Sequence, residues 1–257
     1  YHTRNVEIWN CHIESGDDCI CLKNRREYSP GYQEAFTYLN EQGIVMRSQQ
    51  CRDIQVRNCV MTGRSCTIKI GSENMDSICN VVFEDCKITA SNRGLGIQNR
   101  DEGTVTNVVF KNIDLECRLF SDVWWGKAEP VYVTSYPRAV GDHKDAGWRF
   151  PKGAKEGKCG EVSYITFKNI TGLSENGCFI GADQKGKVHH IFFDNVDIKK
   201  QRVTKYPQGV YDRRPCVGEG FVQDKPTGVA LDNVVEGEHF VNYPKAKGTF
   251  DAGKGTF

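Results

Sequence analysis

The sequence has almost no net charge and no long hydrophobic run, and each absence excludes a class of protein. Its 257 residues carry 34 Lys and Arg against 33 Asp and Glu, a formal net charge of +1. A general nucleic-acid binder needs surplus cations to neutralise phosphates, so we expect no nucleic-acid partner. The longest apolar runs, 108–110 and 191–193 among them, fall far short of the roughly 18 residues needed to span a bilayer, so no membrane partner is expected.

The sequence also lacks any Cys-x-x-Cys pair, although it contains 12 cysteines. Without that spacing we expect no zinc site. This many cysteines is unusual for a cytosolic protein and indicates a secreted, extracellular one with some disulfides. The first residues do not form a signal peptide. We therefore expect the chain to be the C-terminal portion of a longer protein whose signal lies upstream.

A repeat is the strongest pattern present. Six segments alternate apolar and other residues and then reach an Asn or Asp, at Asn10, Asn58, Asp85, Asn112, Asn169 and Asn195. Successive positions are 48, 27, 27, 57 and 26 residues apart, so three gaps equal one period and two equal a period plus an insertion. Short strands at a fixed period, separated by Asn and Gly turns, are typical of stacked β-solenoids. We predict an all-β fold, a right-handed parallel β-helix with about 27 residues per rung.

The same repeat predicts one domain over residues 1–257. We expect loop insertions near 24–44 and 124–160 and a tail from about 203 that covers the last rung. The main alternative is a β-sandwich, which gives no reason for a fixed recurrence. Cys11, Cys59 and Cys86 occupy one column of the aligned segments, so we expect them to stack in the core as small apolar side chains.

Two adjacent carboxylates, Asp17 and Asp18, follow Gly16 at the start of a predicted strand. Holding like charges together is one way in which enzymes keep a general acid protonated. A bare Gly-Asp-Asp sequence is more often a solvated turn, so the tripeptide alone does not establish a catalytic pair.

The sequence around this pair resembles glycoside hydrolase family 28, the polygalacturonase and rhamnogalacturonase family. The similarity rests on NCHIESGDDCICLKN, then GRSCTIKIGSEN, then NRGLGIQNRDEGTVTNVVFKNI, and covers about residues 4 to 136. It implies a right-handed parallel β-helix and hydrolysis with inversion, with Asp17 as the general acid and Asp18 as a second carboxylate that holds the attacking water. It implies no metal and no organic cofactor.

The chain departs from the family pattern at three places. It has Gly63-Arg64-Ser65-Cys66 where the family has Gly-His-Gly, and Gly96-Ile97-Gln98 where the family has its Arg-Ile-Lys substrate clamp. The remaining catalytic Asp of the family would fall before residue 1.

Other polar residues near the pair are candidates for substrate contacts, although each is also compatible with a solvent-facing position on a strand. They are Lys69, Glu73, Arg93, Gln98, Arg100 and Asp101. The second insertion adds Lys127 together with Trp124 and Trp125. The aromatic faces of the two tryptophans are suited to stacking on sugars or to covering the solenoid. Asn169-Ile170-Thr171 is an N-glycosylation sequon.

Two function classes follow. The first is a secreted glycosidase that hydrolyses an acidic or decorated, pectin-like polysaccharide of the cell wall. The second is a non-catalytic β-helix that binds a glycan or serves as a structural module of an extracellular assembly. The intact Asp pair and the Trp-rich loop favour the first class, and the three departures favour the second.

Overall fold

The computed structural model describes residues 3–24, 50–120, 126–137, 158–206, 221–224 and 227–234, and these residues form only β-strands and their connections. Sheet A contains β1 (Arg4–Trp9), β4 (Cys51–Arg57), β7 (Ser77–Ser91), β9 (Thr104–Cys117), β11 (Val162–Ser174), β13 (Val188–Lys200) and β15 (Thr227–Val234), together with the short β2 (His12–Ser15) and β5 (Val60–Gly63). Sheet B contains β3 (Ile20–Asn24), β6 (Cys66–Asn74), β8 (Arg93–Asn99), β10 (Val131–Ser135), β12 (Cys178–Ala182) and β14 (Phe221–Asp224).

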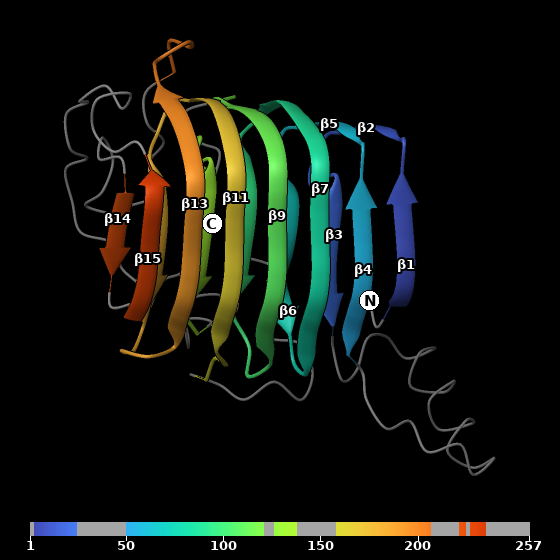
Figure 1. Ribbon diagram of the computed structural model, residues 1–257, viewed down its shortest axis with the longest axis vertical. Coiled ribbons are helices and arrows are strands. Elements are labelled where there is room, and N and C mark those ends of the chain that lie inside the picture. The colour runs from blue at the N-terminus through green and yellow to red at the C-terminus, as the bar shows by residue number, and fades with distance from the viewer. Residues whose placement is uncertain are drawn as a thin grey trace, which may run out of the picture.

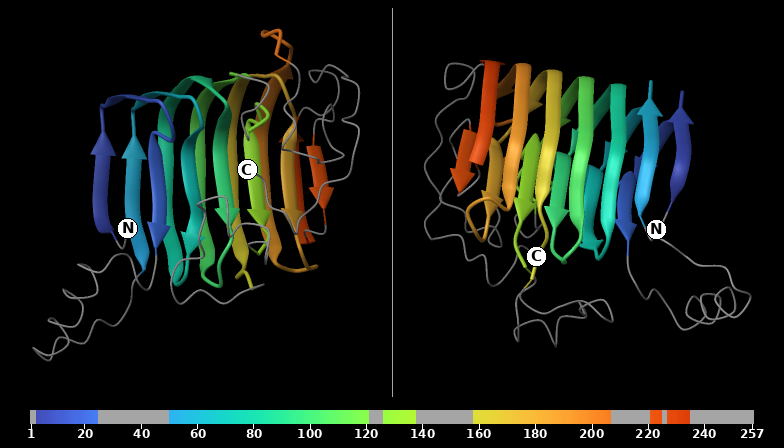
Figure 2. Two further views of the ribbon diagram at one scale, coloured as in Figure 1. Left: turned by 180° about the vertical axis from the view of Figure 1, so that it is seen from behind. Right: turned by 60° about the horizontal axis from the view of Figure 1, so that its bottom comes forward.

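The two sheets face each other, and the chain passes from one to the other in each repeat (Figures 1 and 2). Every described strand pair is parallel, and successive repeats pair in register. This arrangement excludes the antiparallel β-sandwich and confirms the all-β, repeat-based prediction. The insertions near 24–44 and 124–160 and the tail from about 203 lie largely outside the described residues.

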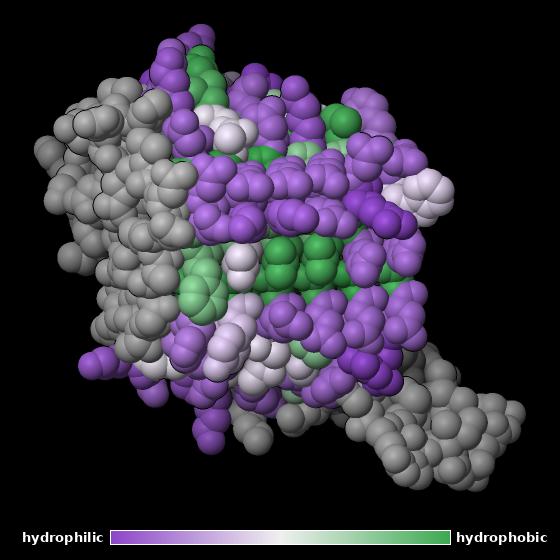
Figure 3. All heavy atoms as spheres, in the orientation of Figure 1, coloured by the Kyte–Doolittle hydropathy of each residue, from purple (hydrophilic) through white to green (hydrophobic). Residues whose placement is uncertain are grey.

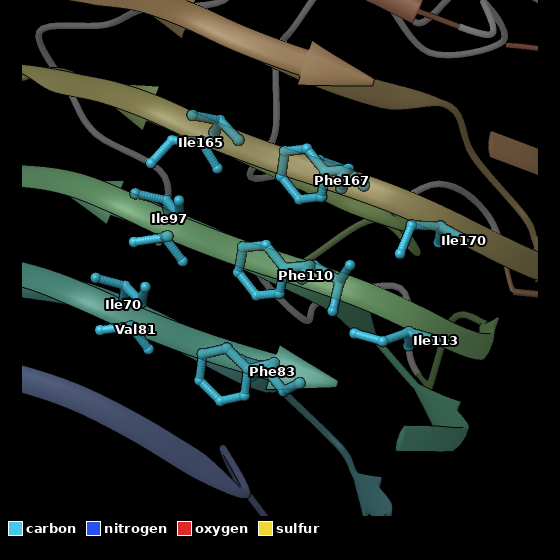
Figure 4. Packing of buried hydrophobic residues seen from close by; sticks show 14 of the residues in the cluster. Ile70, Val81, Phe83, Ile97, Phe110, Ile113, Ile165, Phe167 and Ile170 are labelled. Carbon is cyan, nitrogen blue, oxygen red and sulfur yellow. The ribbon is translucent and has the colours of Figure 1, made fainter. Parts of the chain in front are cut away.

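The core lies between the sheets and is built from columns of like residues (Figure 4). Phe83, Phe110, Phe167 and Phe193 are register partners on four strands of sheet A, and their rings stack with centroids 5.3, 5.0 and 4.8 Å apart. In-register parallel pairing places each residue on its counterpart in the next repeat. A repeated sequence therefore produces continuous columns.

The Asn and Asp positions that mark the repeat all have left-handed backbone conformations. Their φ angles lie between 52° and 56°. A second line of left-handed residues runs five positions earlier, through Asn5, Asp53, Asn80, Asn107, Tyr164 and His190. Asn and Asp adopt this conformation more readily than other side chains, because they bond locally to the backbone. Each long strand of sheet A is therefore bent at two fixed points.

Hydrogen bonds join the marker side chains into a ladder between repeats. Asn112 donates to Asp85 at 2.8 Å, Asn169 donates to Asn112 at 2.8 Å, and Asn195 donates to Asn169 at 2.9 Å. The ladder thus satisfies polar groups at a bend where the strand pairing is interrupted.

The cysteines form a buried column, as predicted, but not the disulfides expected from their number. Cys59 and Cys86 are buried and Cys11 is half-buried in the same column. All eleven cysteines in the described part of the chain are free thiols. The Cys86 Sγ, for example, donates to the Glu84 carbonyl oxygen at 3.2 Å. Cys216 lies outside the described residues.

Among the described residues there is no helix of the length and apolar character needed to cross a membrane.

Candidate active site

Asp17 and Asp18 lie in the short connection between β2 and β3, on the outer side of sheet B. Alternation along β3 directs Ile20 and Leu22 into the core, which leaves Cys21 facing outward. The backbone of the connection is held by the Cys19 N–H, which donates to the Thr67 carbonyl oxygen at 3.1 Å.

The two carboxylates have different surroundings. Asp17 is exposed, and its backbone N–H donates to the Ser15 hydroxyl at 3.1 Å. Asp18 is half-buried: its Oδ1 accepts from the Cys66 backbone N–H at 3.1 Å, and its Oδ2 lies 2.9 Å from Lys69 Nζ. The structure therefore brings Lys69 into contact with Asp18, which is next to Asp17 in the chain, and joins Asp18 to β6 by two hydrogen bonds.

Lys69 projects outward from β6 because its neighbours Ile68 and Ile70 occupy the core. Its side chain and that of Asp18 are each only 10% exposed. Burial has the largest single effect on the pKa of Lys69 and lowers it, but the Asp18 carboxylate together with the nearby Cys21 and Cys66 raises the net pKa above 10.5. Lys69 therefore stays charged as the partner of Asp18.

The same small region holds two thiols. Burial raises the pKa of Cys21 to about 11, and burial together with the nearby Asp18 raises that of Cys66 well above 9.0. Both thiols are therefore protonated at neutral pH and are poor nucleophiles.

Gln98, in the position of the family's clamp lysine, lies opposite Gly71 on the neighbouring strand. It is 4% exposed, and within the described ranges its Nε2 has no hydrogen-bond partner. Gly71 has a φ of 98°, and a Cβ there would lie 2.0 Å from the Gln98 carbonyl oxygen. Only glycine permits this close approach.

Arg93 and Lys127 are placed inside the protein beside Glu129. The Arg93 Nε and Nη2 atoms each lie 3.0 Å from a Glu129 carboxylate oxygen, and its guanidinium lies 3.7 Å from the centre of the Tyr132 ring. The Lys127 backbone N–H donates to Glu129 at 2.9 Å. Since Arg93 is fully buried and Lys127 is 1% exposed, this cluster has a packing role.

The remaining candidates on these strands lie at the opposite end of sheet B from Asp18. Asp101 is buried and accepts from the Asn74 backbone N–H at 3.0 Å. Glu73 is 4.0 Å from Lys23 Nζ, and Arg100 is 5% exposed. These three residues lie at the ends of β6 and β8 and not beside Asp17 and Asp18.

Two predicted features lie elsewhere. Trp124 and Trp125 are outside the described residues. Asn169 is on sheet A, where its amide donates to Asn112 and accepts from Asn195 in the ladder. The sequon amide thus has a structural task in the folded chain.

Two partners were not predicted from the sequence: the Cys66 N–H, which binds Asp18, and Glu129, which binds Arg93. Alternation along β6 could have placed Lys69 outward beside the pair, whereas nothing in the spacing links Arg93 to a residue 36 positions later. No group of three His, Cys, Asp or Glu side chains within the described ranges is arranged to hold a metal ion.

Comparison with known proteins adds no identification: no protein-family model and no curated protein matches the chain.

Proposed function

We propose that this protein is a glycosidase resembling the polygalacturonases, which hydrolyses a pectin-like, acidic or decorated polysaccharide with inversion. The observation that carries the proposal is the unlike environment of the two adjacent carboxylates. Asp17 is exposed, whereas Asp18 is half-buried against Lys69 and the Cys66 N–H. Pairs of acidic groups in contrasting environments are the usual basis of acid and base roles in such enzymes.

In this mechanism Asp17 donates a proton to the leaving-group oxygen. Asp18 is fixed as the partner of a cation, so it is suited to holding the attacking water rather than to giving up a proton. As the water oxygen bonds to the anomeric carbon and the glycosidic bond breaks, the proton that the water loses passes to the Asp18 carboxylate. Its two oxygens offer about four lone-pair positions, and the Cys66 N–H and Lys69 occupy two of them. The others are available to a water molecule.

The proposal includes the finer fold assignment, a right-handed parallel β-helix. Two parallel sheets, visited alternately and in register by one repeat after another, support it. The secreted location of a cell-wall-degrading enzyme and membership of the family are parts of the same proposal.

The test is hydrolysis by the full chain of polygalacturonate, rhamnogalacturonan and other acidic polysaccharides, measured as new reducing ends. Asp17→Asn and Asp18→Asn should each lower the rate by roughly 10²- to 10⁴-fold. Asp114→Asn, on the exposed face of sheet A, is the matched control and should hydrolyse normally. NMR of the first product should show the inverted anomer.

Unchanged hydrolysis in both site variants would reject the catalytic assignment. A second candidate function, a non-catalytic glycan-binding module, is favoured by one observation: Arg93 is fully buried and paired with Glu129 instead of facing a substrate. Absence of hydrolysis by the wild type together with retained polysaccharide binding would establish that alternative.

A further inference from the structure

The outer face of sheet A carries a groove that the proposed catalytic pair does not use. Its floor is a column of register partners on successive strands, from Gln55 through Val82 and Val109 to Thr166 and Phe192. The part of the groove over β1, β4, β7 and β9 encloses about 400 Å³. Figure 3 shows this floor as an apolar band that crosses the strands between two polar bands.

One wall of the groove is a row of side-chain amides. Asn80 donates to Asp53 at 3.0 Å, and Asn107 donates to Asn80 at 2.8 Å. A carboxamide has two N–H donors and an oxygen with two lone pairs, so exposed Asn80 keeps one of each after these bonds. The wall therefore presents spare donors and acceptors at the spacing of neighbouring strands, about 4.8 Å.

Aromatic side chains lie toward both ends of the groove. Tyr164 and His190 continue the second line of left-handed residues beyond Asn107, and their rings stack with centroids 4.7 Å apart. Tyr164 is 52% exposed and Phe192, on the floor, is 37% exposed. Trp9, on the first strand, is 57% exposed. Exposed apolar rings with this arrangement are a suitable surface for the C–H faces of sugars.

The charged side chains that border the groove neutralise one another. Four ion pairs, with N–O distances of 2.6 to 3.8 Å, join Arg52 to Asp53, Arg57 to Glu7, Lys111 to Glu84 and Lys168 to Asp194. Four cations thus balance four carboxylates. An anionic polymer gains no net attraction from this face, and an uncharged polymer does not have to displace a counter-charge.

We propose that this groove binds an uncharged β-1,4-linked glycan. The chain lies across the strands, with hydroxyls on the amide wall and C–H faces on the apolar floor and the aromatic rings. The strand spacing of about 4.8 Å is close to the advance per sugar in an extended glycan of this linkage, so successive sugars meet equivalent amides. Asp17 and Asp18 lie in the connection between β2 and β3, where Asp18 contacts β6 of sheet B, so binding here does not depend on catalysis. Figure 2 shows that sheets A and B lie on opposite sides of the molecule.

The test uses cellohexaose, xylohexaose and mannohexaose as probes in calorimetric titrations of the full chain. Tyr164→Asn combined with His190→Asn removes the stacked rings and places side chains that suit a left-handed backbone at both positions. Because the new amides can extend the ladder from Asn107, this variant should fold with unchanged or higher thermal stability. Its affinity for the hexasaccharide that binds the wild type should fall roughly tenfold or more.

Tyr206→Ala is the matched control, since Tyr206 is another exposed aromatic residue and lies beyond β13. It should bind like the wild type, as should Asp17→Asn. Hexagalacturonate should not compete for the groove. The proposal is overturned if no neutral hexasaccharide binds, if the double variant binds as tightly as the wild type, if Tyr206→Ala loses as much affinity, or if hexagalacturonate competes equally.

Discussion

Lys69 and Arg93 stand on neighbouring strands of sheet B, and each is buried beside one carboxylate. Lys69 pairs with Asp18, and Arg93 forms two hydrogen bonds with Glu129. A buried cation is tolerated only when it is paired, because its lost hydration must be replaced. These charges are therefore committed to internal partners, and the proposed substrate must be recognised by other polar groups.

Lys69→Met should leave the Asp18 carboxylate half-buried without its counter-charge. We expect the free energy of unfolding in urea at pH 7 to fall by about 3 kcal/mol. Lys69→Met with Asp18→Asn should lose much less, because no charge is left unpaired and the new side-chain oxygen can still accept from the Cys66 N–H.

The pH dependence of the free energy of unfolding distinguishes a contribution from this ion pair from one made by packing alone. Lys69 has a folded pKa above its unfolded value of 10.5, so its contribution is complete below pH 10.5 and is lost as pH rises through the folded pKa. The Lys69→Met variant should therefore lose less of its free energy of unfolding than the wild type as the pH rises through this range. Equal alkaline curves for the variant and the wild type would contradict the assignment.

At the scale of the strand, the bends of sheet A explain why Asn and Asp mark the repeat. Asn112 has a φ of 54°, and its amide bonds to Asp85 on one side and to Asn169 on the other. The side chain thus meets a backbone requirement and a pairing requirement together. Tyr164 and His190 have the same left-handed backbone without a side-chain amide, and their rings stack on each other between neighbouring strands.

Asn112→Ala and Asn112→Gly distinguish these two requirements. Both variants lose the ladder bonds, but only alanine pays the additional 1–2 kcal/mol or so of a left-handed backbone. We expect the alanine variant to be the less stable of the two in urea unfolding, even though glycine is more flexible when unfolded. A glycine variant that is the less stable would show that backbone strain is not the reason for asparagine here.

At the scale of the molecule, the described residues form a stack of repeats whose core includes reduced cysteines. Burial raises the pKa of Cys86 to about 11, with Asp85 and Glu84 nearby, and burial likewise raises that of Cys159 to about 11. The eleven described thiols are thus packing groups rather than cross-links. Stability in this part of the chain comes from the contact of each repeat with its neighbours.

Buried thiols make the stack sensitive to alkali. A thiol with a folded pKa of about 11 and an unfolded value of 9.0 stabilises the fold below pH 9, and this contribution is lost as pH rises to about 11. We expect the urea midpoint to fall over this range. Cys86→Val, which matches Val196 in the same column, should make the fall shallower. An identical fall would show that the pKa of Cys86 does not differ between the folded and unfolded states.

Much of the fold could be predicted because the repeat determines register. The six marker positions lie in one line, and the predicted core column of Cys11, Cys59 and Cys86 lies beside it. The second line of bends was not predicted, since two of its six members, Tyr164 and His190, are not Asn or Asp. The candidate site was predicted in part: Asp17, Asp18 and Lys69 come together, whereas Arg93 and Lys127 are buried in a separate cluster.

The order of residues was sufficient for the strands, their period, the inward-facing columns and the position of the carboxylate pair, because these depend on local alternation and on stacking of equivalent residues. Folding in three dimensions was needed to separate Asp18, between Lys69 and the Cys66 N–H, from exposed Asp17. It was also needed to bury Arg93 against Glu129 and to align a neutral groove across sheet A. The physical reason is that burial and charge pairing depend on residues from other repeats, at separations that the period does not specify.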